Sequence, residues 1–204
     1  LAKKIKSNIF IKDYLIYVLL ATVCDVMPLR KLNRLISIEA LKEFKINSNY
    51  AFNELFNLKN KKSKLSINDL GYLIGPILNS GGRLGKSNYA TELLSTDNSD
   101  FLNKRSVELI NLNEKRKKIE KLTLDEINFD KIWRDNKKVI IYYNPNINEG
   151  LIGIIAARLK DYFNKPSIVI TLSNNTLKGS ARSIYGYNIG QVIKSSLDER
   201  IILS

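Results

Sequence analysis

The chain has 204 residues, which is long enough for one large core, or for one complete domain and part of another. Its formal net charge of +13 indicates a polyanionic partner, usually nucleic acid, although its many Lys, Asn and Ile residues also fit translation of an AT-rich genome. The absence of histidine excludes a histidine-based catalytic dyad or triad and a Cys/His zinc site within this sequence.

The first predicted helix covers residues 14–23, with Asp13 as its cap, and it is apolar on nearly all sides, so we expect it to be buried. Its apolar run is shorter than the roughly 20 residues of a membrane span, and we expect no membrane association. Cys24 is the only cysteine, which excludes an internal disulfide and predicts a buried thiol in a reducing, cytoplasmic compartment.

Asp25 follows among apolar neighbours. Burying a carboxylate costs several kcal/mol unless a cation or hydrogen bonds compensate. Two interpretations remain open: Asp25 binds a metal ion, or it accepts backbone N–H bonds from a helix that begins after Pro28.

Residues 31–44 predict an amphipathic helix. Its expected apolar stripe consists of Leu35, Ile38, Leu41 and Phe44. Residues 47–64 are polar and lysine-rich, with a short helical patch at residues 50–56, and a short helix or turn is expected at residues 66–70.

Residues 75–85 contain five Gly or Pro residues, so we expect no regular structure there. Asn79, Gly82 and Arg83 are candidates for a backbone nest that binds a phosphate or carboxylate, and a plain turn is the alternative. A helix is expected at residues 88–94. The longest helix is predicted for residues 100–124, as a strut between two domains whose basic run at residues 115–118 is solvated.

Residues 139–143 form a continuous β-branched and aromatic run, which predicts a strand buried on both faces. A helix is expected from Gly150, with Asn148 as its cap, and a second strand at residues 167–172 completes a parallel crossover unit. The glycines at this helix start, Gly150 and Gly153, permit close approach of a ligand, and the free N–H groups favour phosphate. Ordinary packing of a strand on a helix is the alternative. The expected apolar stripe of this helix is Ile152, Ile155, Ala156, Leu159 and Phe163.

Residues 178–183 combine two hydroxyls, a lysine and an arginine. Arg182 offers a planar fork to a phosphate, Ser180 and Ser183 offer hydroxyls, and Gly179 lets backbone N–H groups face the ligand. A solvated strand with an ordinary polar face is the alternative.

With these segments assembled, the chain resembles the RecJ family of single-strand-specific DNA exonucleases, in the DHH/DHHA1 phosphoesterase superfamily. Four ordered motifs carry the resemblance: residues 21–29 with Asn33-Arg34, the Gly-Pro-x-x-Asn signature of residues 75–84, the Leu-Asn-x-x-Arg-Lys of residues 112–117, and the DHHA1 signatures at residues 149–159 and 179–183.

The resemblance implies an α/β fold with three parts: the C-terminal end of a DHH catalytic domain (residues 1–45), a helical connector (46–135), and a DHHA1 domain with a mixed sheet flanked by helices (136–204). It makes Asp25 a catalytic metal ligand for Mn²⁺ or Mg²⁺. It also makes Arg83, Ser180 and Arg182 contacts of single-stranded DNA.

The implied activity is hydrolysis of single-stranded DNA from its 5′ end in repair and recombination, by a monomer. Two departures from the family stand out. Ile147-Asn148 replaces the usual Trp-His, which removes an aromatic ring and an imidazole from the expected DNA-facing side, and the Asp-His-His motif is absent. We therefore expect these 204 residues to bind single-stranded DNA weakly without hydrolysing it. The alternatives are an oligoribonuclease or cyclic-dinucleotide phosphodiesterase of the same superfamily, and a non-catalytic binding protein.

Overall fold

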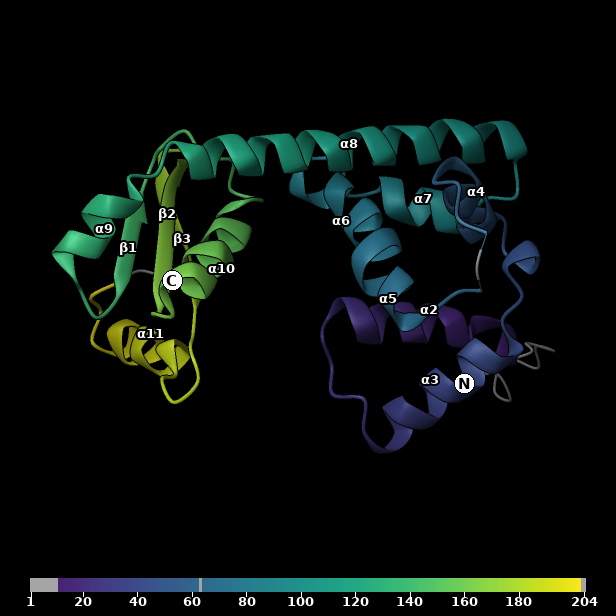
Figure 1. Ribbon diagram of the computed structural model, residues 1–204, viewed down its shortest axis with the longest axis horizontal. Coiled ribbons are helices and arrows are strands. Elements are labelled where there is room, and N and C mark those ends of the chain that lie inside the picture. The colour runs from purple at the N-terminus through teal and green to yellow at the C-terminus, as the bar shows by residue number, and fades with distance from the viewer. Residues whose placement is uncertain (1–10, 63, 203–204) are drawn as a thin grey trace. The chain divides into compact units, whose positions relative to one another are not determined.

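The computed structural model describes residues 11–62 and 64–202, and the chain divides into two compact units with the boundary between Asn113 and Glu114. Helix α8 (Ser99–Asp125) contains this boundary, so it contributes to both units (Figure 1). Within the described residues, no helix is both long enough and apolar enough to cross a membrane.

The first unit is helical. Its elements are α2 (Ile11–Cys24), α3 (Lys31–Glu43), the 3₁₀ helix η1 (Ile46–Ser48), α4 (Tyr50–Leu58), α5 (Ile67–Asp69), the π-helix η2 (Leu70–Ile74), α6 (Gly75–Arg83), α7 (Tyr89–Ser95) and the first part of α8. Fully buried side chains from most of these helices form its core, among them Leu19, Phe52, Leu55, Leu70, Ile74, Ile77, Leu93 and Leu109. The predicted helical patch at residues 50–56 is therefore a core element of this unit.

Two predicted apolar faces in this unit are only partly correct. Tyr14 is 56% exposed, so α2 is not buried on all sides. Of the stripe predicted for residues 31–44, Leu41 and Phe44 pack against the core, whereas Leu35 and Ile38 are 66% and 55% exposed. Ser37 and Ala40 of α3 are buried instead. Small side chains let α3 approach α2 closely, and this packing outweighs the burial of the larger residues.

The prediction of irregular structure at residues 75–85 is wrong, because the backbone is helical from Leu70 through Arg83. Two of these glycines serve packing: a Cβ on Gly75 would lie 2.6 Å from the Cys24 sulfur, and one on Gly81 would lie 2.6 Å from the Lys86 carbonyl oxygen. A glycine costs a helix about 1 kcal/mol relative to alanine, which the close packing offsets. A helix cannot form the proposed backbone nest.

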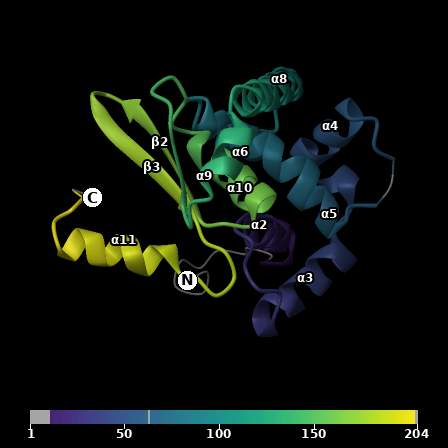
Figure 2. The same ribbon diagram turned by 60° about the vertical axis from the view of Figure 1, so that its left-hand side comes forward.

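The second unit contains the end of α8, α9 (Phe129–Asp135), β1 (Ile140–Tyr143), α10 (Ile152–Phe163), β2 (Ser167–Ser173), β3 (Thr176–Arg182) and α11 (Ile189–Asp198). The sheet order is β1-β2-β3. β1 and β2 are parallel, as the predicted crossover through α10 requires, and β3 returns antiparallel to β2. Asn174 and Asn175 both have positive φ, which suits a two-residue hairpin turn, and Figure 2 shows the long hairpin that results.

Helix α10 packs on one face of this sheet. All five residues of its predicted stripe are buried, which confirms that prediction. Strand β1, however, is not buried on both faces: Ile140 is buried, while Ile141 and Tyr143 are 65% and 53% exposed. A strand's side chains alternate between faces, and α10 covers only one of them.

Candidate nucleic-acid interface

Ser180 and Arg182 of β3 lie against the first turn of α10. Because they are two residues apart in a strand, their side chains project from the same face, the one on which α10 packs. A Cβ built on Gly153 would lie 3.0 Å from Arg182 Nη2 and 3.1 Å from Ser180 Oγ. Because Gly153 has no side chain, these two groups can lie close to the backbone of α10 at this position. We call Gly153, Ser180 and Arg182 the cradle.

The cradle combines three kinds of anion donor. Arg182 is exposed and supplies a guanidinium group, and Ser180 is half-buried and supplies a hydroxyl. At the start of α10 the N–H groups of Ile154 and Ile155 already bond the Leu151 carbonyl oxygen, so the backbone donors at this end are those of Ile152 and Gly153. The helix dipole makes this end favourable for negative charge. Such a combination of backbone N–H groups, hydroxyl and guanidinium suits a phosphate group.

The other predicted residues of residues 178–183 do not join the cradle. A Cβ on Gly179 would meet Ile170 and Ile168 at 3.7 and 3.9 Å, so this position faces the opposite side of the sheet. Ser183 Oγ accepts a hydrogen bond from the Ile189 N–H at 3.2 Å, which fixes the turn before α11. Residues 178–182 are thus part of a regular strand, which agrees with the alternative interpretation of a strand with a polar face. One face of this strand lies against the start of α10.

Asn148 and Gly150 lie in the turn that leads into α10. Asn148 Oδ1 accepts the Gly150 N–H at 2.9 Å, and its carbonyl oxygen accepts the Leu151 N–H. Asn148 therefore caps this turn rather than the helix itself, which begins at Ile152. Ile147 is only 5% exposed and belongs to the core of the second unit, so its side chain does not lie on the surface that we expected to face DNA.

One carboxylate lies beside this turn. Glu149 accepts hydrogen bonds from Lys178 Nζ and Ser173 Oγ, both at 2.5 Å. The bonds from Lys178 and then Ser173 hold the pKa of Glu149 below its usual value, so the group is ionised at neutral pH. Lys178, the lysine of the segment at residues 178–183, is thus paired with Glu149. The i+2 spacing from Lys178 to Ser180 predicts that their side chains share one face of the strand, but it does not identify Glu149, in the turn before α10, as the partner of Lys178.

In the first unit, Asn79, Gly82 and Arg83 lie three and four residues apart on α6 and so share one side of the helix. Asn79 and Gly82 are exposed and Arg83 is half-buried. A Cβ on Gly82 would find nothing within 4 Å. The structure therefore gathers these three residues on an open helical surface instead of the predicted nest.

Asp25 is exposed directly after α2, where its N–H bonds the Ala21 carbonyl oxygen. It is not a buried carboxylate, so the cost that motivated both interpretations does not arise. Burial and then the Asp25 charge raise the pKa of the half-buried Cys24 thiol. Within residues 11–62 and 64–202, no three His, Cys, Asp or Glu side chains gather to hold a metal ion, so the described residues alone do not fit a Mn²⁺ or Mg²⁺ site.

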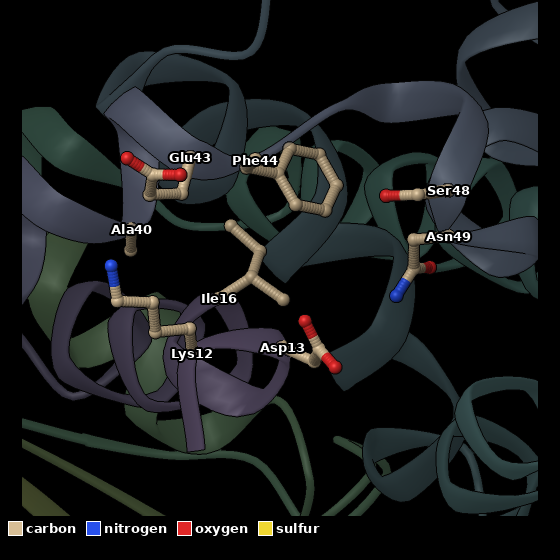
Figure 3. Close-up of a pocket in the computed structure, with 8 residues that line it drawn as sticks. All are labelled: Lys12, Asp13, Ile16, Ala40, Glu43, Phe44, Ser48 and Asn49. Atoms are coloured by element: carbon tan, nitrogen blue, oxygen red, sulfur yellow. The ribbon is translucent and has the colours of Figure 1, made fainter. Parts of the chain in front are cut away.

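A hollow of about 460 Å³ lies in the first unit where α2, α3 and η1 meet (Figure 3). Its lining is Lys12, Asp13, Ile16, Ala40, Glu43, Phe44, Ser48 and Asn49. Lys12 is paired with Glu39 at 3.4 Å. Because two carboxylates face a single lysine in this lining, the hollow does not suit a phosphate backbone.

Residues 136–198 match the family model of the DHHA1 domain. RecJ of Haemophilus influenzae, a single-stranded-DNA-specific exonuclease, is 32% identical over 190 residues, which cover 89% of this chain and 33% of that protein. Two solved structures of RecJ from Thermus thermophilus, in complex with Mg²⁺ and with Mn²⁺, align with 97% of this chain at a TM-score of 0.80 and 23% identity, and the chain covers 30% and 29% of them.

These likenesses agree with the geometry. The mixed sheet with flanking helices is the predicted fold class and matches the DHHA1 region of RecJ. The chain spans about a third of the length of the curated relatives it matches. The chain belongs to the RecJ family, and its residues 136–198 are a DHHA1 domain.

Proposed function

We propose that this chain holds single-stranded DNA as part of a RecJ-type exonuclease, which hydrolyses the strand from its 5′ end in DNA repair and recombination. The cradle carries this proposal, because Arg182, Ser180 and the start of α10 bring a cation, a hydroxyl and backbone N–H groups close to one another. Relatives named single-stranded-DNA-specific exonucleases support the choice of ligand.

In this proposal a backbone phosphate occupies the cradle. The Arg182 guanidinium donates two hydrogen bonds to phosphate oxygens, and the Ser180 hydroxyl donates a third. Asn79 and Arg83 on α6 make a further contact with the strand. These contacts recognise phosphate and sugar, so they position the strand without reading its sequence.

Hydrolysis requires more than the described residues provide. We propose that Asp25 contributes one ligand to a Mn²⁺ or Mg²⁺ site whose other ligands lie outside the described part of the chain. Divalent ions in such sites activate water and stabilise the departing oxygen. We therefore expect the purified chain to bind DNA without cutting it.

The test is fluorescence anisotropy of a labelled oligonucleotide across a salt series. We expect single-stranded DNA to bind more tightly than duplex of equal length. Arg182→Gln should weaken binding and reduce the slope of log affinity against log salt by about 0.7, the loss of one phosphate contact on a single strand. Arg134→Gln is the matched control, because Arg134 is an exposed arginine of the same unit on α9.

Two results would change the proposal. Equal effects of Arg182→Gln and Arg134→Gln would remove the cradle from the interface. Mn²⁺-dependent hydrolysis by the purified chain would show that these 204 residues suffice for catalysis, against the proposal that the other metal ligands lie elsewhere.

A further inference from the structure

The turn that follows the cradle presents a tyrosine ring entirely to solvent. Tyr185 is 104% exposed, the highest value among the described large hydrophobic residues. It lies three residues after Arg182, so its Cα is within about 11 Å of the Cα of Arg182 even in a fully extended chain. The proposed phosphate contact and the aromatic ring are therefore carried by neighbouring positions of the backbone.

The turn is held firmly. Ile184 and Tyr187 form a β-bridge, and the Tyr187 N–H bonds the Ile184 carbonyl oxygen at 3.2 Å. Gly186 has φ of +79°, the value a type II turn requires at its third position. The Ser183 hydroxyl, just before the turn, accepts a hydrogen bond from the Ile189 N–H after it. The backbone that carries Tyr185 is thus fixed before any ligand arrives, which lowers the entropic cost of using its ring.

The turn does not itself need a tyrosine. Tyr185 occupies its second position, where proline is favoured and most residues are tolerated, since only the third position demands glycine. The ring does not contribute to the core of the second unit either. Neither local conformation nor packing accounts for a large aromatic side chain at this point.

Single-strand binding supplies a reason. Proteins that hold single strands without sequence preference combine cations along the backbone with aromatic rings on which bases stack. The cradle provides the first of these, and Tyr185 provides the second beside it. A base is available for stacking in a single strand and is already paired and stacked in a duplex.

We propose that Tyr185 is a nucleobase-stacking residue: the base next to the phosphate in the cradle stacks on its ring. This inference rests on the proposed function. It adds a preference for unpaired bases, which phosphate contacts alone do not provide.

The test compares a labelled single-stranded oligonucleotide with an abasic one of the same length. Tyr185→Ala should weaken binding of the base-containing strand at least about fivefold, as expected for the loss of one stacked base, while Tyr185→Phe and Tyr185→Trp retain it. All variants should bind the abasic strand like the parent chain, and the salt slope should not change, because no charge is removed.

Tyr143→Ala is the matched control. Tyr143 is a 53% exposed tyrosine in the same unit, and it pairs with Ile170 on the sheet face opposite to Ser180 and Arg182. It should leave both affinities unchanged. Thermal denaturation would establish that each variant folds.

Three results would overturn the inference in distinguishable ways. If the parent chain binds no single-stranded DNA, the proposed function fails and the stacking role fails with it. If the parent binds and Tyr185→Ala binds equally well, only the stacking role fails. An equal loss for the abasic strand would show that Tyr185 acts through the structure of the turn and not through a base.

Discussion

Replacing Gly153 with alanine separates stability from ligand binding. The new Cβ would lie 3.0 Å from Arg182 Nη2 and 3.1 Å from Ser180 Oγ, so both groups must move by a few tenths of an ångström. Both are ends of flexible side chains, so this movement costs little, and alanine favours a helix over glycine by about 0.5–1 kcal/mol. We expect the free energy of unfolding to stay constant or to rise.

Binding should change in the opposite direction, because the methyl group displaces the Arg182 guanidinium and the Ser180 hydroxyl, the two side-chain donors proposed to hold the phosphate. A hydrogen bond to a charged group contributes about 1.5–3 kcal/mol, so losing one raises the dissociation constant roughly 10- to 100-fold. Urea denaturation would measure stability, and anisotropy with a labelled single strand would measure affinity.

Gly71→Ala is the control for this substitution. A Cβ on Gly71 would lie 3.4 Å from Val23 Cγ1, an ordinary contact, in a helical segment of the other unit. It should leave affinity unchanged. If Gly153→Ala folds with equal or greater stability and binds DNA like the parent chain, the cradle is not the phosphate site.

Three further predictions concern carboxylates. Although burial alone would raise the pKa of Asp69, its bonds with Lys61 and Ser66 hold that pKa below its usual value, so the stabilisation is complete above about pH 4 and is lost as the pH falls through the lowered pKa. Asp69→Asn should cost about 2 kcal/mol at neutral pH and flatten this acid dependence in urea denaturation. Glu149→Gln should release Lys178 towards the cradle, increasing affinity for single-stranded DNA about two- to threefold and steepening the salt dependence in anisotropy. Glu120 is buried and accepts from Arg116 at 2.6 Å and Arg158 at 2.8 Å, so Glu120→Gln should lower the free energy of unfolding by about 2–3 kcal/mol in thermal or urea denaturation.

The ion pairs of Glu149, Asp69 and Glu120 show why a count of charges in the sequence does not locate a binding surface. Lys178 pairs with Glu149 and Lys61 pairs with Asp69. Neither carboxylate is adjacent to its lysine in the sequence, and no sequence motif identifies it as the partner. A cation's partner depends on which elements pack together. The net charge of +13 is therefore a weaker guide to the interface than the side chains left facing solvent at the start of α10.

Periodicity and strand patterning predicted part of the second unit from sequence, whereas α9 and α11 were not predicted. The stripe of α10 and the parallel strand crossover follow from local patterns that tertiary contacts do not contradict. In the first unit the same approach failed at residues 75–83, because glycine signals both a turn and close helix packing. Only the packing of α6 near Cys24 distinguishes these possibilities.

The sequence by itself determined the residue types of the candidate interface: an arginine, hydroxyls and glycines near a helix start. It could not decide which of them meet, because that depends on strand register and on which sheet face α10 covers. Register places Ser180 and Arg182 over Gly153 and turns Gly179 to the far side. Since side chains of a strand alternate, a shift of one residue would reverse this selection, and only the tertiary structure fixes that shift.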